Sequence, residues 1–432
     1  LTLGGPGTAV TLGSGATQTG FGRTGTVDWC TTAKTSPFTS VSGNGYFVNT
    51  TGGVVTVTLP SSPSAGDIVS INDYARTFGN NNVTICRNSS KMCGNCFNST
   101  LKTDGQSITL IYVDGTKGWK AVNDDDVGAL GAEFIAATGG TITTCGNFKI
   151  HTFTSNGCFQ VTNAGNSGGS NTVSYLVVAG GGGGAGRYGG GGGGGGFREG
   201  LGLNDSYTGS PLRSPTGVPV SVQTYPITVG AGGTNAPSAP SNAEGTPGAN
   251  SVFSTITSAG GARGGGQSGT GCRNGGSGGG GSYGTSGIGA AGAGNTPPVS
   301  PPQGNPGGTG SAAPLNAMGG GGGATEAGQA GSGPPNKSGR GGAGGTTNIP
   351  GSPISKSGGG GGASSTPESI TAGAASPCGS GTAGAASPGN PASNAAANSG
   401  GGGGGGNYIS PPDATTSGQG GSGIIVIRYK FQ

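Results

Sequence analysis

The sequence predicts an all-β protein, in which an N-terminal β-sandwich or jelly-roll domain precedes a glycine-rich domain anchored by β-strands. Three observations support this fold class. Short β-branched and aromatic runs recur between residues 30 and 178 at fairly regular spacing. The 107 glycines and 27 prolines make up about 31% of the 432 residues, and the glycines concentrate after residue 179. Apolar runs at 176–178 and 424–427 stand on either side of that region.

The composition limits the classes of partner. Only 8% of the residues are charged and the formal net charge is +4, which favours neither nucleic acid nor an anionic membrane surface as partner. No apolar run approaches the length of a membrane-spanning helix, so membrane insertion is not expected. The low charge also differs from that of typical disordered chains, and no Gly-X-Y repeat indicates collagen.

Residues 1–28 form an N-terminal extension rich in glycine and threonine, with one alternating piece at 8–12. In that piece Thr8, Val10 and Leu12 share a face, as in a β-strand. Two interpretations stay open: an unstructured terminus, or an assembly strand added to the exposed sheet edge of a neighbouring subunit.

Residues 29–127 are predicted to form a β-sandwich domain. Most of its six β-branched or aromatic runs alternate with period two, and Gly, Pro, Asn or Ser separates them. The runs lie at 45–49, 54–59, 67–71, 83–86, 108–113 and 119–122. The strongest helix candidate, 127–137, is short and is expected to act as a connector.

Residues 128–178 are predicted to supply a β-hairpin connector and the first strands of the C-terminal domain. The expected strands are 141–144, 148–153, 158–161 and 173–178. The glycine-rich domain then covers 179–423, and 424–432 is the closing strand.

The glycine-rich region is predicted to be ordered rather than disordered. A linker would not need a matching apolar strand at its far end, so 176–178 and 424–427 are expected to pair in one sheet. Further strands are expected at 227–230 and 251–257. Without Cβ atoms, extended strands with three residues per turn can approach closely and bond laterally through their backbones. Runs of glycine for such strands recur within 180–196, 260–281, 319–323, 340–345, 358–362 and 400–406.

Eight cysteines in a chain with one histidine and little charge favour disulfides and therefore an extracellular location. Cys145 and Cys158 flank a hairpin-like pair and are expected to bond across it, and Cys272 and Cys378 are expected to staple the glycine-rich domain. The CxxC at Cys93 and Cys96 is expected to form a disulfide loop with Cys86 or Cys30. Candidate glycosylation sequons begin at Asn49, Asn82, Asn88, Asn98, Asn204 and Asn336.

No enzymatic chemistry is predicted. His151 is the only histidine and lies in an alternating run, which indicates a half-buried strand residue and excludes triads and multi-histidine metal sites. The carboxylates of Asp124, Asp125 and Asp126 are a weak candidate for calcium, although a solvated turn is favoured. No cofactor is expected, and acidic residues are too sparse to favour a polysaccharide-cleaving carboxylate pair.

Four aromatic residues beside glycine runs are surface contact candidates, namely Tyr188, Phe197, Tyr283 and Tyr408. They are equally consistent with side chains that cap the ends of glycine strands.

The order of several motifs resembles the glycine-rich domain of phage tail-fibre and related structural proteins of aquatic phages and bacteria. The motifs are GYFVNTT at 45–51, VTLP at 57–60, YVDG at 112–115, YLVVAGGGG at 175–183, GFREG at 196–200, VGAGG at 229–233, FSTITSAGG at 253–261 and GSGIIVIRY at 421–429. The resemblance spans roughly residues 38–430. It implies glycine-rich tips packed as polyglycine II helices, with exposed loops that contact a host receptor.

These observations predict a non-enzymatic, extracellular structural protein that assembles with copies of itself as a subunit of a cell-surface filament or a virion fibre. The alternative is a distal adhesin of a phage tail fibre that binds cell-surface glycans through aromatic residues of the glycine loops.

Overall fold

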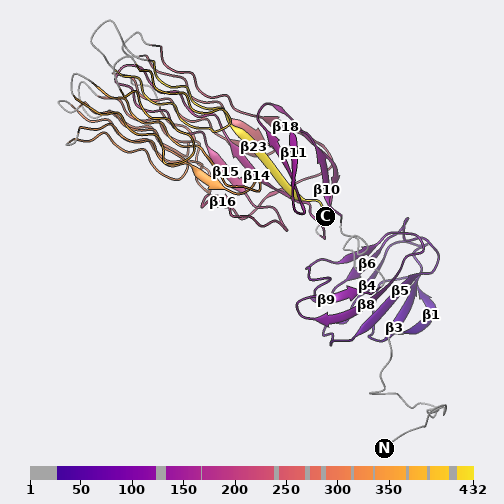
Figure 1. The fold of residues 1–432 in the computed structure, drawn as a ribbon. Helices are drawn as coiled ribbons and strands as arrows, with labels where there is room; N and C mark the ends of the chain where they lie inside the picture. Colours follow the sequence, from indigo (N-terminus) through magenta and orange to yellow (C-terminus); the bar gives the residue numbers. More distant parts are fainter. Residues whose placement is uncertain are drawn as a thin grey trace, which may run out of the picture. The chain divides into compact units, whose positions relative to one another are not determined.

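The computed structural model describes residues 27–122, 133–166, 168–237, 243–267, 273–283, 289–312, 316–333, 336–365, 369–386, 390–407 and 416–432. Within these ranges the chain forms strands and extended segments, and the fold is all-β, as predicted (Figure 1). Accordingly, the described residues contain no helix with the length and apolar character needed to cross a membrane. The chain forms two compact units, unit 1 up to Ala132 and unit 2 from Glu133.

Unit 1 consists of two sheets around one core. The first sheet has the order β1 (Asp28–Lys34), β3 (Asn44–Val48), β5 (Ile68–Asp73), β8 (Ser107–Asp114) and β9 (Gly118–Ala121). The second has the order β2 (Phe38–Thr39), β4 (Val55–Thr58), β6 (Val83–Cys86) and β7 (Ser99–Leu101). Alternating residues of both sheets, such as Val57, Ile71 and Ile85, are fully buried in the shared core. All six predicted runs form strands, and the sandwich is confirmed.

The pairing within these sheets rules out a jelly roll, which is antiparallel. Strands β1, β3 and β5 are mutually parallel, and so are β2, β4 and β6. The first six strands alternate between the two sheets, so the chain winds as a coil that advances by one strand in each sheet per turn. Period-two alternation is the same in a coil and in a jelly roll, and the sequence pattern therefore could not distinguish them.

The prediction of a helical connector at 127–137 is wrong for the C-terminal end of that range. Ile135–Thr138 forms strand β10, in which Ile135 and Ala137 are buried, whereas Ala136 and Thr138 are exposed. Residues 127–132 lie outside the described ranges.

Unit 2 begins with a second sandwich. One sheet has the order β10, β13 (Gly157–Ala164), β18 (Thr224–Thr228), β19 (Ser251–Phe253) and β20 (Ile256–Ser258). The other has the order β11 (Thr141–Cys145), β12 (Phe148–Phe153), β23 (Ile424–Lys430), β14 (Thr172–Val178), β15 (Phe197–Gly200) and β16 (Arg213–Ser214), with β17 (Val218–Pro219) beside β14. A separate hairpin joins β21 (Gly345–Thr347) to β22 (Ile354–Lys356). The predicted strand at 251–257 is the hairpin β19–β20, which turns at Ser254 with φ of 52°.

The predicted pairing of the two strands that bracket the glycine region is confirmed. Strand β23 lies between β12 and β14, and Val178 pairs with Ile424 and Leu176 with Val426. Ile425 and Ile427 pack into the core between the sheets, whereas Ile424 and Val426 pack on the opposite face. Because both faces are covered, the strand is a continuous apolar run.

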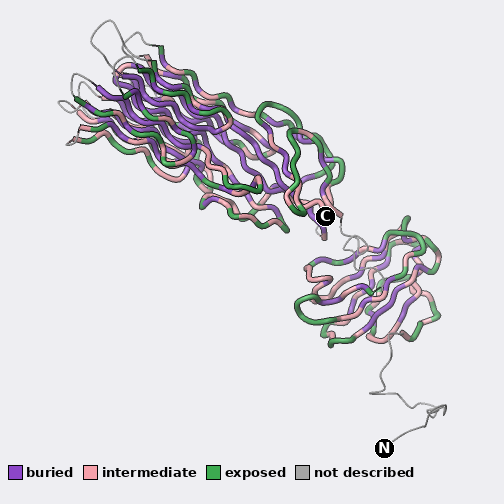
Figure 2. Tube along the Cα trace, in the orientation of Figure 1, coloured by how far each residue is buried: buried purple, intermediate pink, exposed green. Residues whose placement is uncertain are grey.

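Six strands of this sandwich continue directly into glycine segments. After β14, β18 and β20 the chain enters 179–185, 229–236 and 259–265, and it returns to β15, β19 and β23 from 189–196, 243–250 and 416–423. The segments lie side by side (Figure 1), and buried residues run along the centre of the group (Figure 2). The sandwich therefore sets the starting positions of the glycine segments, which we call the glycine bundle together with the later segments between 273 and 407.

Candidate functional site

The backbone hydrogen bonds of the glycine bundle repeat every three residues. In segment 179–185 successive amides donate to three different neighbouring segments in turn, and amides three residues apart donate to the same segment. The donor–acceptor pairs are Gly180–Ala249 and Gly183–Thr246, Gly181–Gly421 and Gly184–Gly418, and Gly182–Gly193 and Ala185–Gly190, with N···O distances of 2.9 to 3.2 Å. Bonds that point in three directions in turn are those of an extended chain with three residues per turn.

Segment 189–196 shows how an interior segment is surrounded. Its amides donate to 400–406, 259–265 and 319–322, and its carbonyls accept from 179–185, 277–280 and 360–363. The segment is thus bonded to six others, and its buried polar groups are paired through the backbone alone. Side chains contribute almost nothing to this interior.

Glycine is required here because a Cβ atom would not fit. A Cβ on Gly182 would overlap the carbonyl oxygen of Ala262, and one on Gly192 would overlap that of Gly182. The glycines of the runs 180–184 and 189–196 all avoid positive φ. Close approach of backbones, rather than an unusual backbone conformation, therefore explains these glycines.

In the outer segments of the bundle glycine recurs at every third position and other residues occupy many of the positions between. In 243–249 the buried Gly245 faces the interior, whereas Thr246 and Pro247 are exposed. In 304–310 the buried Gly304 and Gly310 likewise alternate with the exposed Pro306 and Thr309. This spacing is a sequence signal for outer segments that the search for continuous glycine runs overlooked.

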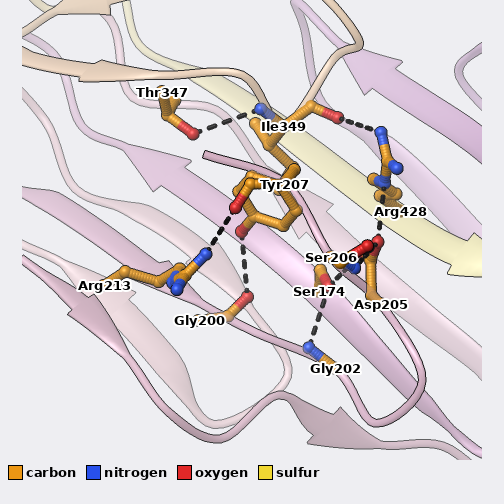
Figure 3. Close-up of polar contacts among 10 residues, drawn as sticks. All are labelled: Ser174, Gly200, Gly202, Asp205, Ser206, Tyr207, Arg213, Thr347, Ile349 and Arg428. Carbon is orange, nitrogen blue, oxygen red and sulfur yellow. Dashed lines mark hydrogen bonds and ion pairs between the residues drawn. The ribbon is translucent and has the colours of Figure 1, made fainter. Parts of the chain in front are cut away.

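A buried ion pair involves Arg428 of β23, on the sheet face that the 201–217 loop covers (Figure 3). The Arg428 guanidinium donates to the Asp205 carboxylate at 3.1 Å, and the two side chains are only 5% and 2% exposed. The guanidinium also lies 4.2 Å from the ring centroid of Phe148, and it donates to the Ile349 carbonyl at 3.3 Å. The second Asp205 oxygen accepts from the Ser174 hydroxyl at 2.6 Å. The pair joins the 201–217 loop and the 347–349 turn to the sheet.

Glu199 on β15 is a second buried charge beside this pair. Its carboxylate accepts from the amide and hydroxyl of Ser210 at 2.9 and 2.6 Å and from the Thr347 hydroxyl at 2.5 Å. Burial, with the nearby carboxylates of Glu199 and Asp205, raises the pKa of Tyr207 above its ordinary value, so the phenol stays protonated. Protein groups satisfy these charges, which indicates a structural rather than a catalytic role.

An open hollow of about 560 Å³ adjoins the same loop, lined by residues that include Thr172, Leu203, Asn204, Pro215 and Thr216. It contains no acid pair in a groove of the kind that glycoside cleavage needs. Among the described residues no group of three or more His, Cys, Asp or Glu side chains could hold a metal ion.

Charged and aromatic side chains also gather away from the sandwich, near the turn between segments 179–185 and 189–196. Tyr188 in this turn packs against Tyr283 with ring centroids 5.0 Å apart and the ring planes tilted by 57°, and Met318 packs beside them. Glu244 contacts Arg263 at 2.8 Å and Arg273 at 3.7 Å. Burial lowers the pKa of Arg273 from its ordinary value.

His151 is a core residue, more deeply buried than the half-buried position predicted for it. It has no exposed surface, its Nδ1 lies 2.7 Å from the Gly139 carbonyl and its Nε2 lies 3.0 Å from the Tyr429 hydroxyl. The contact with the carbonyl assigns the proton to Nδ1, so Nε2 accepts from Tyr429. Burial lowers the pKa of His151 and raises that of Tyr429 to about 12.

This burial predicts a pH dependence of stability. Because the pKa of His151 is lower in the folded state than the ordinary 6.5, the unfolded chain binds more protons below that pH. The stability from neutral His151 is therefore fully present above about pH 6.5 and is lost as the pH falls toward the folded-state pKa. Thermal unfolding between about pH 8 and pH 5 should show this decline, and His151→Gln should flatten it. Equal pH profiles for the two chains would contradict the assignment.

The disulfide predictions are wrong for this structure. Cys145 on β11 and Cys158 on β13 belong to different sheets and both are free thiols, as are Cys30, Cys86 and Cys96. Cys93 packs against the core of the first unit, and the thiols of Cys86 and Cys30, which were expected to join its disulfide loop, are free. Cys378 is a thiol that donates to the Gly344 carbonyl at 3.3 Å, so the expected staple is not formed, and Cys272 lies outside the described residues.

Two of the aromatic surface candidates are not on the surface. Tyr188 and Phe197 are 6% and 1% exposed. Tyr188 packs against Met318 at a turn of the bundle, whereas Phe197 starts β15 and packs against Leu176 and Val178 of the sandwich. Of the two interpretations, these residues fit the capping one. Tyr283 is partly buried, and Tyr408 lies outside the described residues.

The remaining candidates are placed as follows. Asn98 and Asn204 are exposed and Asn49, Asn82, Asn88 and Asn336 are partly buried, and their glycosylation stays a prediction. Thr8, Val10, Leu12, Asp124, Asp125 and Asp126 lie outside the described residues.

Taken together, unit 2 is a β-sandwich whose strands run on into a backbone-bonded glycine bundle. A family model described as a glycine-rich domain matches residues 154–430, from the end of β12 to the end of β23. This match covers more than half of the chain, and the protein belongs to the glycine-rich domain family. The comparison with curated proteins gives no match.

Proposed function

We propose that this chain is a non-enzymatic, extracellular structural protein, a subunit of a self-assembling filament or of a phage-type fibre. The observation that carries the proposal is the lattice of three-residue hydrogen-bond repeats around 189–196, in which each backbone is held by its neighbours. We take these segments to be polyglycine II helices. A lattice of this kind is a stiff element without an interior for substrates, which suits a mechanical role.

The surface of the bundle supports the same role. Its outer positions carry mostly Thr, Pro, Ser, Ala and Asn, and several of its few charges are paired, as in the Arg340–Glu326 contact at 2.7 Å. Such an exterior is hydrated and nearly neutral. The proposal does not depend on disulfides, since burial in the bundle comes from backbone contacts.

A second candidate function is a distal adhesin that binds cell-surface glycans. Tyr283 favours it, because this partly buried ring, which packs against Tyr188, offers an apolar face and a polar hydroxyl at a turn of the bundle. Under this alternative the turns of the bundle make the contact with the host.

Electron microscopy of the purified native material tests the proposal. A helical or linear array built from this one chain is the expected result. A particle that carries one or a few copies only at a fibre tip would overturn the filament function and favour the adhesin. Truncation of 180–423 should then abolish binding to host cells.

A further inference from the structure

The larger sheet of unit 1 has two edge strands, and other backbone of the described residues 27–122 covers only one of them. The two outer strands of that sheet are β9 and β1. At β9 the Trp119 amide donates to the Lys91 carbonyl at 2.9 Å, and the Trp119 carbonyl accepts from the Cys93 amide at 2.8 Å. A bridge between Met92 and Trp119 completes this cover. Within residues 27–122, β1 pairs with β3 on one side and with no strand on the other.

The open edge of β1 has the features of a pairing template. It is seven residues long, and its exposed residues include Trp29, Thr31 and Thr32. Its charges, Asp28 and Lys34, stand only at its two ends. Natural proteins usually shorten, charge or cover such edges, because their unpaired N–H and C=O groups recruit another strand. Among residues 27–122, β9 is covered, whereas no strand pairs with the outer side of β1.

The coil geometry indicates which strand would fit beside β1. Successive strands of this sheet begin at Asp28, Asn44 and Ile68, which are 16 and 24 residues apart. The alternating segment that starts at Thr8 begins 20 residues before Asp28, within the same range of spacings. The segment is uncharged and places Val10 and Leu12 on one face, as a strand added to a sandwich requires.

The sequence between this segment and β1 favours exchange between copies over closure within one copy. A further coil of the same chain would need a strand for the second sheet beside β2, as β4 lies between β3 and β5. Residues 13–26 (GSGATQTGFGRTGT) have no alternating apolar run and are rich in glycine and threonine, so the sequence predicts no strand for the second sheet there. A linker of this length spans about 20 Å on average and more when extended, which allows it to reach a neighbour.

We propose that residues 8–12 of one copy add to the open edge of β1 in a neighbouring copy. The inference rests on the proposed function and names the contact by which subunits join. Backbone hydrogen bonds to β1 supply the attachment, and the covered edge at β9 makes the joint directional.

Photo-crosslinking of the full-length chain tests this contact. The amino acid p-benzoylphenylalanine replaces the exposed Thr31, and equal amounts of nitrogen-15-labelled and unlabelled copies are assembled and irradiated. The expected product joins the β1 peptide to a peptide with residues 8–12, in mixed-isotope pairs. The same amino acid in place of the exposed Val122, beyond the covered strand β9, is the control and should give no such product.

The outcomes separate the inference from the proposed function. If every product contained only one isotope, the segment would return to its own copy, and the inference would be overturned. Filaments without any crosslink from position 31 to residues 1–26 would also overturn it, while leaving the structural function standing. Absence of both filaments and mixed products would overturn both. As a second variant, Val10→Asp should prevent assembly with an unchanged unfolding temperature, and normal filaments from it would contradict the inference.

Discussion

Replacing Gly192 by alanine is expected to destabilise unit 2 by about 3 kcal/mol or more, at the upper end of the cost of overpacking. Its Cβ would overlap the Gly182 carbonyl oxygen, and Gly192 is bonded to Gly403 and Gly360 on two other sides. The surrounding atoms are backbone atoms of a lattice, so they cannot move aside as flexible side chains do. Urea titration with pulse proteolysis measures the change in the unfolding free energy.

Gly157→Ala is the matched control in the same unit. A Cβ on Gly157 would meet nothing closer than Phe153 at 3.6 Å, an ordinary contact. Alanine there restricts the unfolded chain and should change stability by less than about 1 kcal/mol. Equal urea midpoints for the two variants would show that the interior of the glycine bundle is not packed as described.

Replacing Arg428 by methionine is expected to cost about 3–5 kcal/mol, because it leaves the buried Asp205 carboxylate without its counter-charge. The loss includes the hydrogen bond to Ile349 and the contact with the Phe148 ring. Removing both charges, in the chain with Asp205→Asn and Arg428→Met, should cost less than the sum of the single replacements. A double-mutant cycle from calorimetric unfolding measures this coupling.

Arg340→Met provides the comparison at the surface. Arg340 contacts Glu326 at 2.7 Å, but the Glu326 side chain is 42% exposed. Water can solvate that carboxylate after the replacement, so the expected cost is under about 1 kcal/mol. A cost at Arg428 no larger than at Arg340 would contradict the structural role of the buried pair.

The sequence predicted those parts of the fold that depend on local pattern. The apolar runs around Val177 and Ile425 were expected to pair, because an anchored insertion needs strands at both of its ends, and they do. Of the strands of unit 1, β1, β2 and β7 were not expected, whereas β3, β4, β5, β6, β8 and β9 were. Their parallel pairing was not, since the alternation along β3 or β4 contains no information about which strand lies beside it.

The features that could not be predicted depend on contacts between residues far apart in the sequence. Asp205 and Arg428 are 223 residues apart, and charged residues are usually solvated, so nothing local marked them as a buried pair. The disulfide predictions used the number of cysteines and their flanking positions. They failed for Cys145 and Cys158 because the chain crosses from one sheet to the other between them.

Amide hydrogen exchange of residues 179–196 tests the central claim, that the glycine half is a folded, backbone-bonded lattice. The amides of Gly182 and Gly192 donate at 2.9 and 2.8 Å inside the bundle, so their exchange should be slowed strongly compared with that of an unstructured peptide of the same sequence. Mass spectrometry of peptides from this region gives the rates. Protection that persists for hours would support the lattice and the structural role built on it. Exchange as fast as in the free peptide would contradict both.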